Sequence, residues 1–252
     1  MTGEYIQKIF LSGSFDENSS YVYSLPVIKN LIRMRGITLN RDVTFFAGEN
    51  GTGKSTLLEA IAAAYGFNPE GGGWNFNFST YRSHSPLCDS LRLWKGARSP
   101  SDGFFLRAES FYNAASYIEE LDGIPAFSPP IKYSYGGKSL HEQSHGESFL
   151  ALILNRFGGN GLYILDEPEA ALSPSGQFTL LSQIGNLVKK RSQFIIATHS
   201  PILLAYPDAD IFVLSEDDIR LTPYEETEHY VLTREFLNNP RKILKHLLQD
   251  QD

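Results

Sequence analysis

The chain has 252 residues, of which 42% are hydrophobic and 13% aromatic. A chain of this length and apolar content can bury a large core, and it favours one elaborated α/β domain, residues 1–252, over two cramped ones. The formal net charge of −7 argues against a broad basic surface for nucleic acid, although it leaves a local basic groove open.

The composition also bears on the compartment in which the protein works. The one cysteine, Cys88, cannot form an internal disulfide, and no basic segment leads into an apolar stretch at the N-terminus. The longest apolar runs, Phe149–Leu154 and Phe194–Tyr206, are too short or too interrupted to cross a bilayer. These features predict a cytoplasmic protein without direct membrane insertion, held by a partner if it works at a membrane.

Strand-like and helix-like segments alternate from about Val43 to Leu214, which is typical of a largely parallel sheet covered by helices. The first pair is a buried strand at Val43–Ala47 and a helix at Ser55–Ala64. Phe67–Ser79 is dense in Gly, Asn and aromatic residues and predicts an ordered surface insertion. The later elements predicted are a helix at Ser110–Leu121, a long loop at Gly123–Gly137, a helix at Glu147–Phe157, a strand at Leu162–Leu165, a helix at Ser175–Lys189, strands at Phe194–Ala197 and Ile211–Leu214, and a final helix at Thr233–Leu248.

A glycine-rich loop joins the first strand to its helix and matches the pattern G-x-x-x-x-G-K-[ST]. Its residues are Gly48, Glu49, Asn50, Gly51, Thr52, Gly53, Lys54 and Ser55. The glycines let the backbone wrap closely around phosphate, with successive N–H groups and the helix N-terminus facing the anion. Lys54 supplies a positive charge to the β- and γ-phosphates, Ser55 offers a hydroxyl to Mg²⁺, and Thr56 caps or lines the same turn. The loop therefore predicts a site for ATP and Mg²⁺.

Two adjacent carboxylates follow the predicted strand Leu162–Leu165. Asp166 and Glu167 stand at its carboxyl end, the edge where ligands bind in open α/β sheets. Asp166 is placed to orient Mg²⁺, directly or through water, and Glu167 to polarise an attacking water as general base. An acidic pair before Pro168 could also begin an ordinary turn, but the phosphate loop upstream favours the catalytic interpretation.

A histidine follows the next predicted strand in a similar way. His199 comes directly after Phe194–Ala197, so it would lie beside the γ-phosphate end of the site. A lone histidine is more often structural, and its position after the strand is what favours a functional role here.

In this order, the three motifs resemble the Walker A, Walker B and switch-histidine elements of ATP-binding-cassette (ABC) ATPases. Phe45–Ile61 and Asp166–Pro174 resemble the soluble RecF/SMC-like branch, which includes small bacterial ATPases of the AAA family; transporter subunits are similar, but less so. The resemblance spans about Val43–Pro201. It implies a P-loop NTPase of ABC-ATPase type, with a mixed, mostly parallel sheet flanked by helices, and an insertion and helical signature region at about residues 67–145.

The same family carries a signature loop before Walker B, and the matching stretch here is Gln143–Glu147. A helix N-terminus with a serine hydroxyl and a close-approach glycine is suited to an anion. In the family this loop meets the γ-phosphate held by the other protomer, so the resemblance implies nucleotide binding in trans by Ser144, Gly146 and Glu147. His145 departs from the usual small residue, and a simple N-cap with a glutamate three residues on is a competing interpretation.

Other positions depart from the family pattern or leave alternatives open. Ser173 replaces the usual acidic residue after Walker B, and no glutamine occurs between Gln7 and Gln143, where the family places one that touches Mg²⁺ and the attacking water. Tyr21 or Tyr23 could stack on adenine, or both could be strand core residues. The substitutes for the glutamine by position are Ser83, His84 and Ser85, with an ordinary surface turn as the alternative.

These features predict an ATPase head that closes as a head-to-tail homodimer over two nucleotides, with Glu167 activating water and His199 and Lys54 stabilising the charge that develops. The chain lacks the length and heptads for a long coiled coil. By resemblance, DNA maintenance or phage defence with a partner effector protein is the expected setting. A transporter's ATP-hydrolysing subunit and a P-loop small-molecule kinase are the alternatives.

Overall fold

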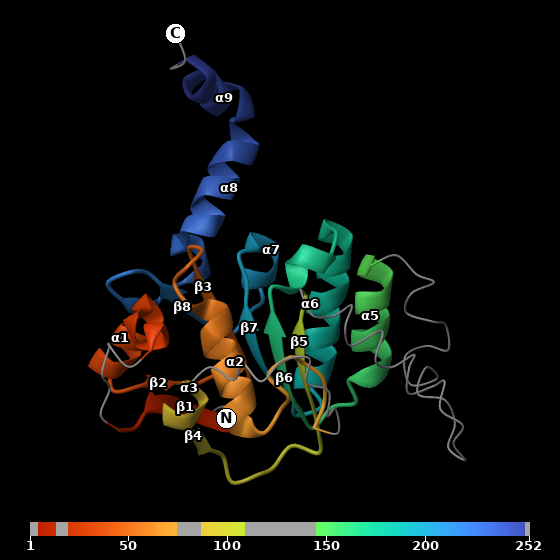
Figure 1. Ribbon diagram of the computed structural model, residues 1–252. Helices are drawn as coiled ribbons and strands as arrows, with labels where there is room; N and C mark the ends of the chain where they lie inside the picture. Colours follow the sequence, from red (N-terminus) through yellow and green to blue (C-terminus); the bar gives the residue numbers. More distant parts are fainter. Residues whose placement is uncertain (1–4, 14–19, 75–86, 109–144, 250–252) are drawn as a thin grey trace.

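The computed structural model describes residues 5–13, 20–74, 87–108 and 145–249 (Figure 1). Its centre is a six-stranded sheet in the order β5 (Asp102–Arg107), β6 (Gly161–Asp166), β7 (Gln193–Ala197), β3 (Val43–Gly48), β8 (Asp210–Leu214) and β9 (Ile219–Leu221). The first five strands run parallel, and β9 is antiparallel to β8 at the edge. A smaller antiparallel sheet has the order β2 (Ile37–Thr38), β1 (Ile6–Leu11) and β4 (Leu91–Lys95).

Helices and the small sheet cover the two faces of the central sheet. One face packs against α1 (Pro26–Arg33), α2 (Lys54–Tyr65), α3 (Leu87–Ser90) and the small sheet, and the other against α5 (His145–Arg156), α6 (Pro174–Val188) and α7 (Pro201–Leu204). Short 3₁₀ helices lie at Tyr21–Ser24 (η1), Pro168–Ala171 (η4) and Tyr224–Glu226 (η5).

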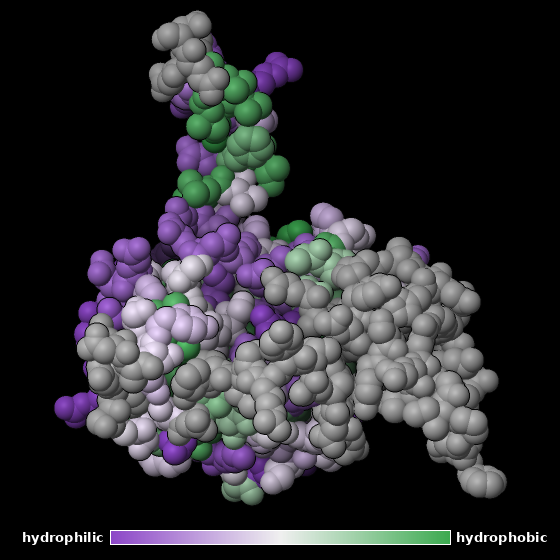
Figure 2. All heavy atoms as spheres, in the orientation of Figure 1, coloured by the Kyte–Doolittle hydropathy of each residue, from purple (hydrophilic) through white to green (hydrophobic). Residues whose placement is uncertain are grey.

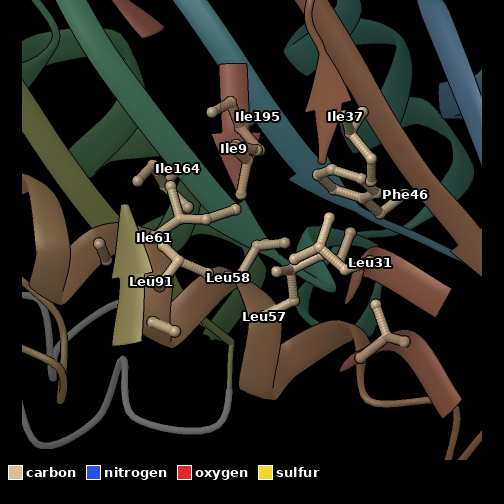
Figure 3. Close-up of a cluster of buried hydrophobic side chains, with 14 of the residues drawn as sticks. Ile9, Leu31, Ile37, Phe46, Leu57, Leu58, Ile61, Leu91, Ile164 and Ile195 are labelled. Carbon is tan, nitrogen blue, oxygen red and sulfur yellow. The ribbon is translucent and has the colours of Figure 1, made fainter. Parts of the chain in front are cut away.

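Successive side chains of a strand point to opposite faces of the sheet, so they belong to two different hydrophobic cores. In β6, Leu162 and Ile164 belong to the core under α2, whereas Tyr163 and Leu165 belong to the core under α5 and α6. Figure 3 shows the first core, where Ile164 and its neighbours on the sheet meet the aliphatic residues of α2. A central strand buried on both faces reads as a continuous apolar run, which is why β6 was recognisable from sequence.

The four strands predicted from sequence are confirmed as β3, β6, β7 and β8, and the sheet is mostly parallel, as predicted. The predicted helices after the glycine-rich loop, before β6 and after β6 are confirmed as α2, α5 and α6. The predictions at 75–79, 110–121 and 123–137 lie outside the described residues. In the part of the chain that the structure describes, no helix is both long and apolar enough to span a membrane.

The prediction of one final helix at Thr233–Leu248 is wrong, because this segment forms two helices. They are α8 (Glu228–Asn238) and α9 (Pro240–Gln249), separated by Asn239 in a non-helical conformation (φ −136°, ψ 50°). The cause is Pro240: its ring disfavours the helical conformation of the preceding residue, and it is itself well suited to open a new helix.

The two C-terminal helices rise from the body of the molecule (Figure 1). Apolar side chains lie exposed along them, which appear as green atoms on the projecting part in Figure 2. The large exposed ones are Leu232, Phe236, Leu237, Leu244, Leu247 and Leu248. The start of α8 is less exposed to solvent than the rest of the two helices. Thr227, the residue just before α8, is only 1% exposed.

Candidate nucleotide-binding site

The glycine-rich loop lies between β3 and α2, at the carboxyl edge of the central sheet. Gly48, Gly51 and Gly53 have φ values of 136°, 83° and 96°, in the left-handed region that favours glycine. A Cβ on Gly48 would clash with the Leu214 carbonyl, and one on Gly53 would lie 2.6 Å from Val27 Cγ1. Both the backbone conformation and the close neighbours therefore require glycine at these positions.

Lys54 is folded back over the loop that precedes it. Its side chain is almost fully buried, and Nζ donates hydrogen bonds to the carbonyls of Gly48 (3.0 Å) and Glu49 (2.8 Å). Burial lowers the pKa of Lys54, while the carboxylates of Glu167 and Asp166 act in the opposite direction. The ammonium group thus lies inside the curve of the loop, with acidic residues across from it.

Ser55 and Asp166 meet although they come from distant parts of the chain. The hydroxyl of Ser55, in the first turn of α2, donates to Asp166 Oδ1 at 3.0 Å at the end of β6. Asp166 is 5% exposed. A hydroxyl and a carboxylate are the hard oxygen ligands that Mg²⁺ prefers, with phosphate and water completing its shell. The residues present therefore fit a magnesium ion.

Glu167 follows Asp166 in a conformation rare for residues other than glycine. Its φ and ψ are 49° and 52°, and its N–H donates to the Ala197 carbonyl of the neighbouring strand at 3.0 Å. This turn directs the Glu167 side chain away from β6 toward His199, whose Nε2 lies 3.5 Å from Oε1. Local backbone strain of this kind is common at functional sites.

A second carboxylate, that of Glu169, holds the backbone of His199 in place. Its Oε1 accepts the backbone N–H of His199 at 2.6 Å, and its Oε2 is buried. Burial raises the pKa of Glu169, and the hydrogen bond from His199 acts against that rise. The sequence analysis did not single out Glu169; the only signal was a further acidic residue two positions after Glu167.

Arg107, also not singled out, occupies the position beside Asp166 on the neighbouring strand β5. The two residues are in register, and Arg107 Nε lies 3.4 Å from Asp166 Oδ2 while its guanidinium also contacts Glu59 at 3.3 Å. In the sequence β5 lies between the Walker A and Walker B motifs, and its carboxyl end reaches the site. The predicted glutamine substitutes at 83–85 lie outside the described residues.

Of the signature residues, those that the structure describes lie at the start of α5, next to the end of η4. Helix α5 begins at His145, and Ser144 lies outside the described residues. A Cβ on Gly146 would come within 2.8 Å of the Ala171 carbonyl, which explains glycine there. A cavity of about 470 Å³ lies between the N-terminal ends of α5 and α6 and is lined in part by Gly146, Glu147 and Ser173. Ser173 caps α6 by accepting the N–H of Gly176 at 3.2 Å.

The two tyrosines considered for adenine differ in exposure. Tyr23 is buried (9% exposed) and bonds to Ser90 Oγ at 2.9 Å, so it belongs to the core, within the 3₁₀ helix η1 rather than a strand. Tyr21 is 73% exposed, and its stacking on adenine stays a prediction. Helix α1, which follows η1, contacts the glycine-rich loop directly, since the Val27 N–H donates to the Thr52 carbonyl at 3.1 Å.

Comparisons with known proteins agree with this geometry. A family described as "AAA domain, putative AbiEii toxin, Type IV TA system" matches residues 139–205, and a family described as "AAA domain" matches residues 30–86. An uncharacterised ABC transporter ATP-binding protein of Haemophilus influenzae is 25% identical over 202 residues, which are 75% of this chain and 76% of that one.

Solved structures match at lower identity, and the first of the two named here has a similar fold. The ATP-binding cassette MJ1267 of an ABC transporter covers 94% of this chain and 98% of that chain at 17% identity, with a TM-score of 0.51. The SMC head domain from Thermotoga maritima covers 87% of this chain and 98% of that chain at 16% identity, with a TM-score of 0.43.

The chain is thus similar, over most of its length, to an ABC transporter ATP-binding protein in sequence and to an ATP-binding cassette in fold. The two AAA-domain matches cover the Walker A region and the stretch from the signature to the switch histidine, in agreement with the resemblance found in the sequence.

Proposed function

We propose that this domain binds ATP with Mg²⁺ and hydrolyses it. The observation that carries the proposal is the 3.0 Å contact between Ser55 and Asp166, which are 111 residues apart in sequence. They meet directly beside a glycine loop whose backbone is shaped to surround an anion. A chance glycine turn would not bring a magnesium-type pair of oxygen ligands to its helix.

In the proposed site the backbone N–H groups of Gly51–Ser55 and the N-terminus of α2 bind the phosphates. Lys54 exchanges its two loop carbonyls for the β- and γ-phosphate oxygens. Ser55 and Asp166 hold Mg²⁺, which neutralises charge on the phosphates when bound. Arg107 contacts Asp166 and Glu59, and this pairing supports a role in holding the Asp166 carboxylate in place.

Hydrolysis is assigned to the side chains beyond the phosphates. Glu167 accepts a proton from the attacking water as general base. His199, held through its backbone by Glu169, donates a hydrogen bond to the γ-phosphate as negative charge develops there. The short distance between Glu167 and His199 supports their action on the same phosphate.

The second half of each site is proposed to come from another copy of the chain. The cavity between the ends of α5 and α6 combines two helix N-termini with the hydroxyls of Ser173 and Ser175, a setting that suits a phosphate. Ser144, Gly146 and Glu147 would meet the γ-phosphate of the partner in trans. Head-to-tail closure of two copies then completes two sites together.

Glu167→Gln tests the proposal. This substitution keeps the size of the side chain and removes the base, so we expect ATP turnover to fall at least about 100-fold while the Kd for ATP with Mg²⁺ stays within a few-fold of wild type. Lys54→Ala should instead lose ATP affinity by isothermal titration. Unchanged turnover by the Glu167→Gln protein would rule out the assigned base.

A transporter subunit is the second candidate, because the Haemophilus influenzae relative carries that description. Both candidates share the ATP site and differ in the partner. A pull-down with the Glu167→Gln protein and ATP separates them: a membrane protein among the bound components supports the transporter, and a soluble effector or DNA supports DNA maintenance or phage defence. ATP turnover without any added acceptor would exclude a kinase.

A further inference from the structure

A pair of histidines joins the C-terminal helix α8 to the candidate site. His229, in the first turn of α8, places Nε2 3.4 Å from Nδ1 of His199, and the two ring centroids are 5.5 Å apart. The other ring nitrogen of His199, Nε2, lies 3.5 Å from Glu167 Oε1. His199 thus lies between Glu167 and His229, with one ring nitrogen near each.

The start of α8 is attached to the segment that carries His199. Thr227 caps the helix, and its hydroxyl donates to the Tyr224 carbonyl at 2.7 Å. The Tyr224 hydroxyl donates in turn to the carbonyl of Pro201 at 2.9 Å, two residues after His199. His229 is therefore held in place by contacts that do not involve its own ring.

The proton positions on the two rings follow from their partners. Burial lowers the pKa of His199 and of His229, and it outweighs the opposing effects of Glu167 on His199 and of Glu228 on His229; the Lys54 ammonium also lowers both, so the neutral rings predominate at pH 7. A neutral imidazole has one N–H and one acceptor nitrogen. Glu167 can only accept, so His199 carries its proton on Nε2. Its Nδ1 is then an acceptor and needs a donor.

His229 supplies that donor through its Nε2–H. In the opposite arrangement, a bare Nε2 of His199 would face the carboxylate of Glu167. In addition His229 would bury an N–H at Nδ1, an atom that has no hydrogen-bond partner among the described residues. An unpaired buried N–H costs about 1–3 kcal/mol. His199 Nε2 likewise has no hydrogen bond among the described residues, so the two arrangements differ in electrostatics: only the first places an N–H 3.5 Å from the carboxylate of Glu167.

We propose that His229 is a positioning residue that fixes His199 in the tautomer with its proton on Nε2. That tautomer directs an N–H toward Glu167 and the place assigned to the γ-phosphate, where a bare nitrogen would repel both. The inference rests on the proposed function for its catalytic consequence, but the tautomer itself is a property of the protein without nucleotide. Hydrogen-bonded partners of functional imidazoles commonly act in this way.

The first measurement is the tautomer of His199. With the imidazole nitrogens labelled with ¹⁵N, two-dimensional NMR distinguishes Nε2–H from Nδ1–H in the wild-type protein, and a His199→Gln protein identifies which signals belong to His199. We expect the Nε2–H form. Predominance of the Nδ1–H form in wild type would overturn the proposal. This result stands whether or not the protein hydrolyses ATP, so it separates a failure of the inference from a failure of the proposed function.

Three variants measure the consequence. The amide nitrogen of His229→Gln lies where Nε2 was and can donate, so we expect kcat within about 3-fold of wild type. His229→Glu offers only an acceptor, so Nδ1 of His199 must carry a proton. This either leaves Nε2 bare in the neutral ring or charges the ring and pairs it with Glu167, which weakens the base, so kcat should fall about 10- to 100-fold. The matched control is His246→Glu on the exposed face of α9, which should leave kcat unchanged.

The contrast between glutamine and glutamate excludes a purely structural role. Equal losses of kcat in both His229 variants, with the His199 tautomer unaltered in both, would mean that the ring acts only by packing and would overturn the proposal. Full activity of the His229→Glu protein would also overturn it. Melting temperatures of the variants establish that each is folded at the assay temperature.

Discussion

At the scale of single residues, one carboxylate oxygen of Glu169 holds the backbone of the turn after β7. Glu169 Oε1 accepts the backbone N–H of His199 at 2.6 Å, so this carboxylate determines where the histidine lies. Burial raises the pKa of Glu169 and so acts against its ionised form, while the hydrogen bond from His199 acts in the opposite direction. An acceptor of the same shape without charge satisfies the same N–H.

Two substitutions of Glu169 therefore have different expected effects. Glu169→Ala leaves the His199 N–H unpaired and should lower the free energy of unfolding by about 1–3 kcal/mol in urea. Glu169→Gln keeps an acceptor oxygen for the His199 N–H but places an amide N–H at the buried position of Oε2, so we expect a smaller loss than for alanine, of about 1 kcal/mol. Glu225→Ala, an exposed glutamate in η5, is the control and should have little effect. Equal destabilisation by Ala and Gln at position 169 would show that the charge itself is required.

At the scale of elements, a polar junction ties β5, β6 and the end of α5 together below the site. Asp102 at the start of β5 accepts hydrogen bonds from the Tyr163 hydroxyl (2.7 Å), the Arg156 guanidinium (2.7 Å) and the Gly158 N–H (2.9 Å). Burial acts to raise the pKa of Asp102, but these donors outweigh it and hold the pKa below its usual range. Burial also raises the pKa of Tyr163, which keeps its hydroxyl a donor.

This junction gives a pH-dependent contribution to stability with a defined sign. A carboxyl group whose pKa is lower in the folded state stabilises the fold fully above its unfolded pKa of about 3.9, and the stabilisation is lost as pH falls through the folded pKa. Asp102→Asn should lower the free energy of unfolding by about 2 kcal/mol at pH 7, and by less below pH 4.

The control for that measurement is Asp208→Asn, at a side chain that is 86% exposed and 3.9 Å from Arg41. Exposed ion pairs contribute little, so we expect a change of under about 0.5 kcal/mol at either pH. If Asp102→Asn lost as much stability at pH 3 as at pH 7, the ionised form of Asp102 would not be what stabilises the junction.

Strands that are buried on both faces of the sheet could be predicted from sequence, whereas the edge strands could not. Strands β3, β6 and β7 are continuous apolar runs followed at once by functional residues, and each was recognised. β5 carries the run Gly103–Leu106 but begins after polar residues, and its neighbour in the sheet is 59 residues away, from Asp102 to Gly161. Arg107 was missed because only pairing in the sheet brings it to Asp166.

The residues of the candidate site likewise fall into those that the sequence predicted and those that it did not. Five residues of the site lie in short motifs, so a few consecutive residues were enough to predict their chemistry. They are Lys54, Ser55, Asp166, Glu167 and His199. His229 contacts the site across 30 positions, and its sequence surroundings, an exposed amphipathic helix, carry no sign of this. Contacts made by tertiary packing alone leave no pattern in one sequence.

At the scale of the whole molecule, the glycine loop and the cavity at the ends of α5 and α6 are built from different elements. The loop with Ser55 joins β3 to α2, whereas α5, α6 and the end of η4 line the cavity. In the proposed dimer, the cavity of one copy meets the phosphate bound at the loop of the other. A change at the cavity should then weaken assembly while leaving nucleotide binding at the loop intact.

Gly146→Ala makes that separation measurable. The added Cβ would lie 2.8 Å from the Ala171 carbonyl, so α5 must shift relative to η4 and the cavity changes shape. In a Glu167→Gln background with ATP and Mg²⁺, we expect the dimer seen by sedimentation velocity to weaken about 10-fold or more, which is about 1.4 kcal/mol, with ATP affinity unchanged. Gly185→Ala in α6 is the matched control, because its Cβ would meet nothing closer than the Tyr206 hydroxyl at 3.9 Å. Alanine is also the better helix former there. Equal dimerisation of the two glycine variants would mean that the cavity at α5 takes no part in closing the two copies.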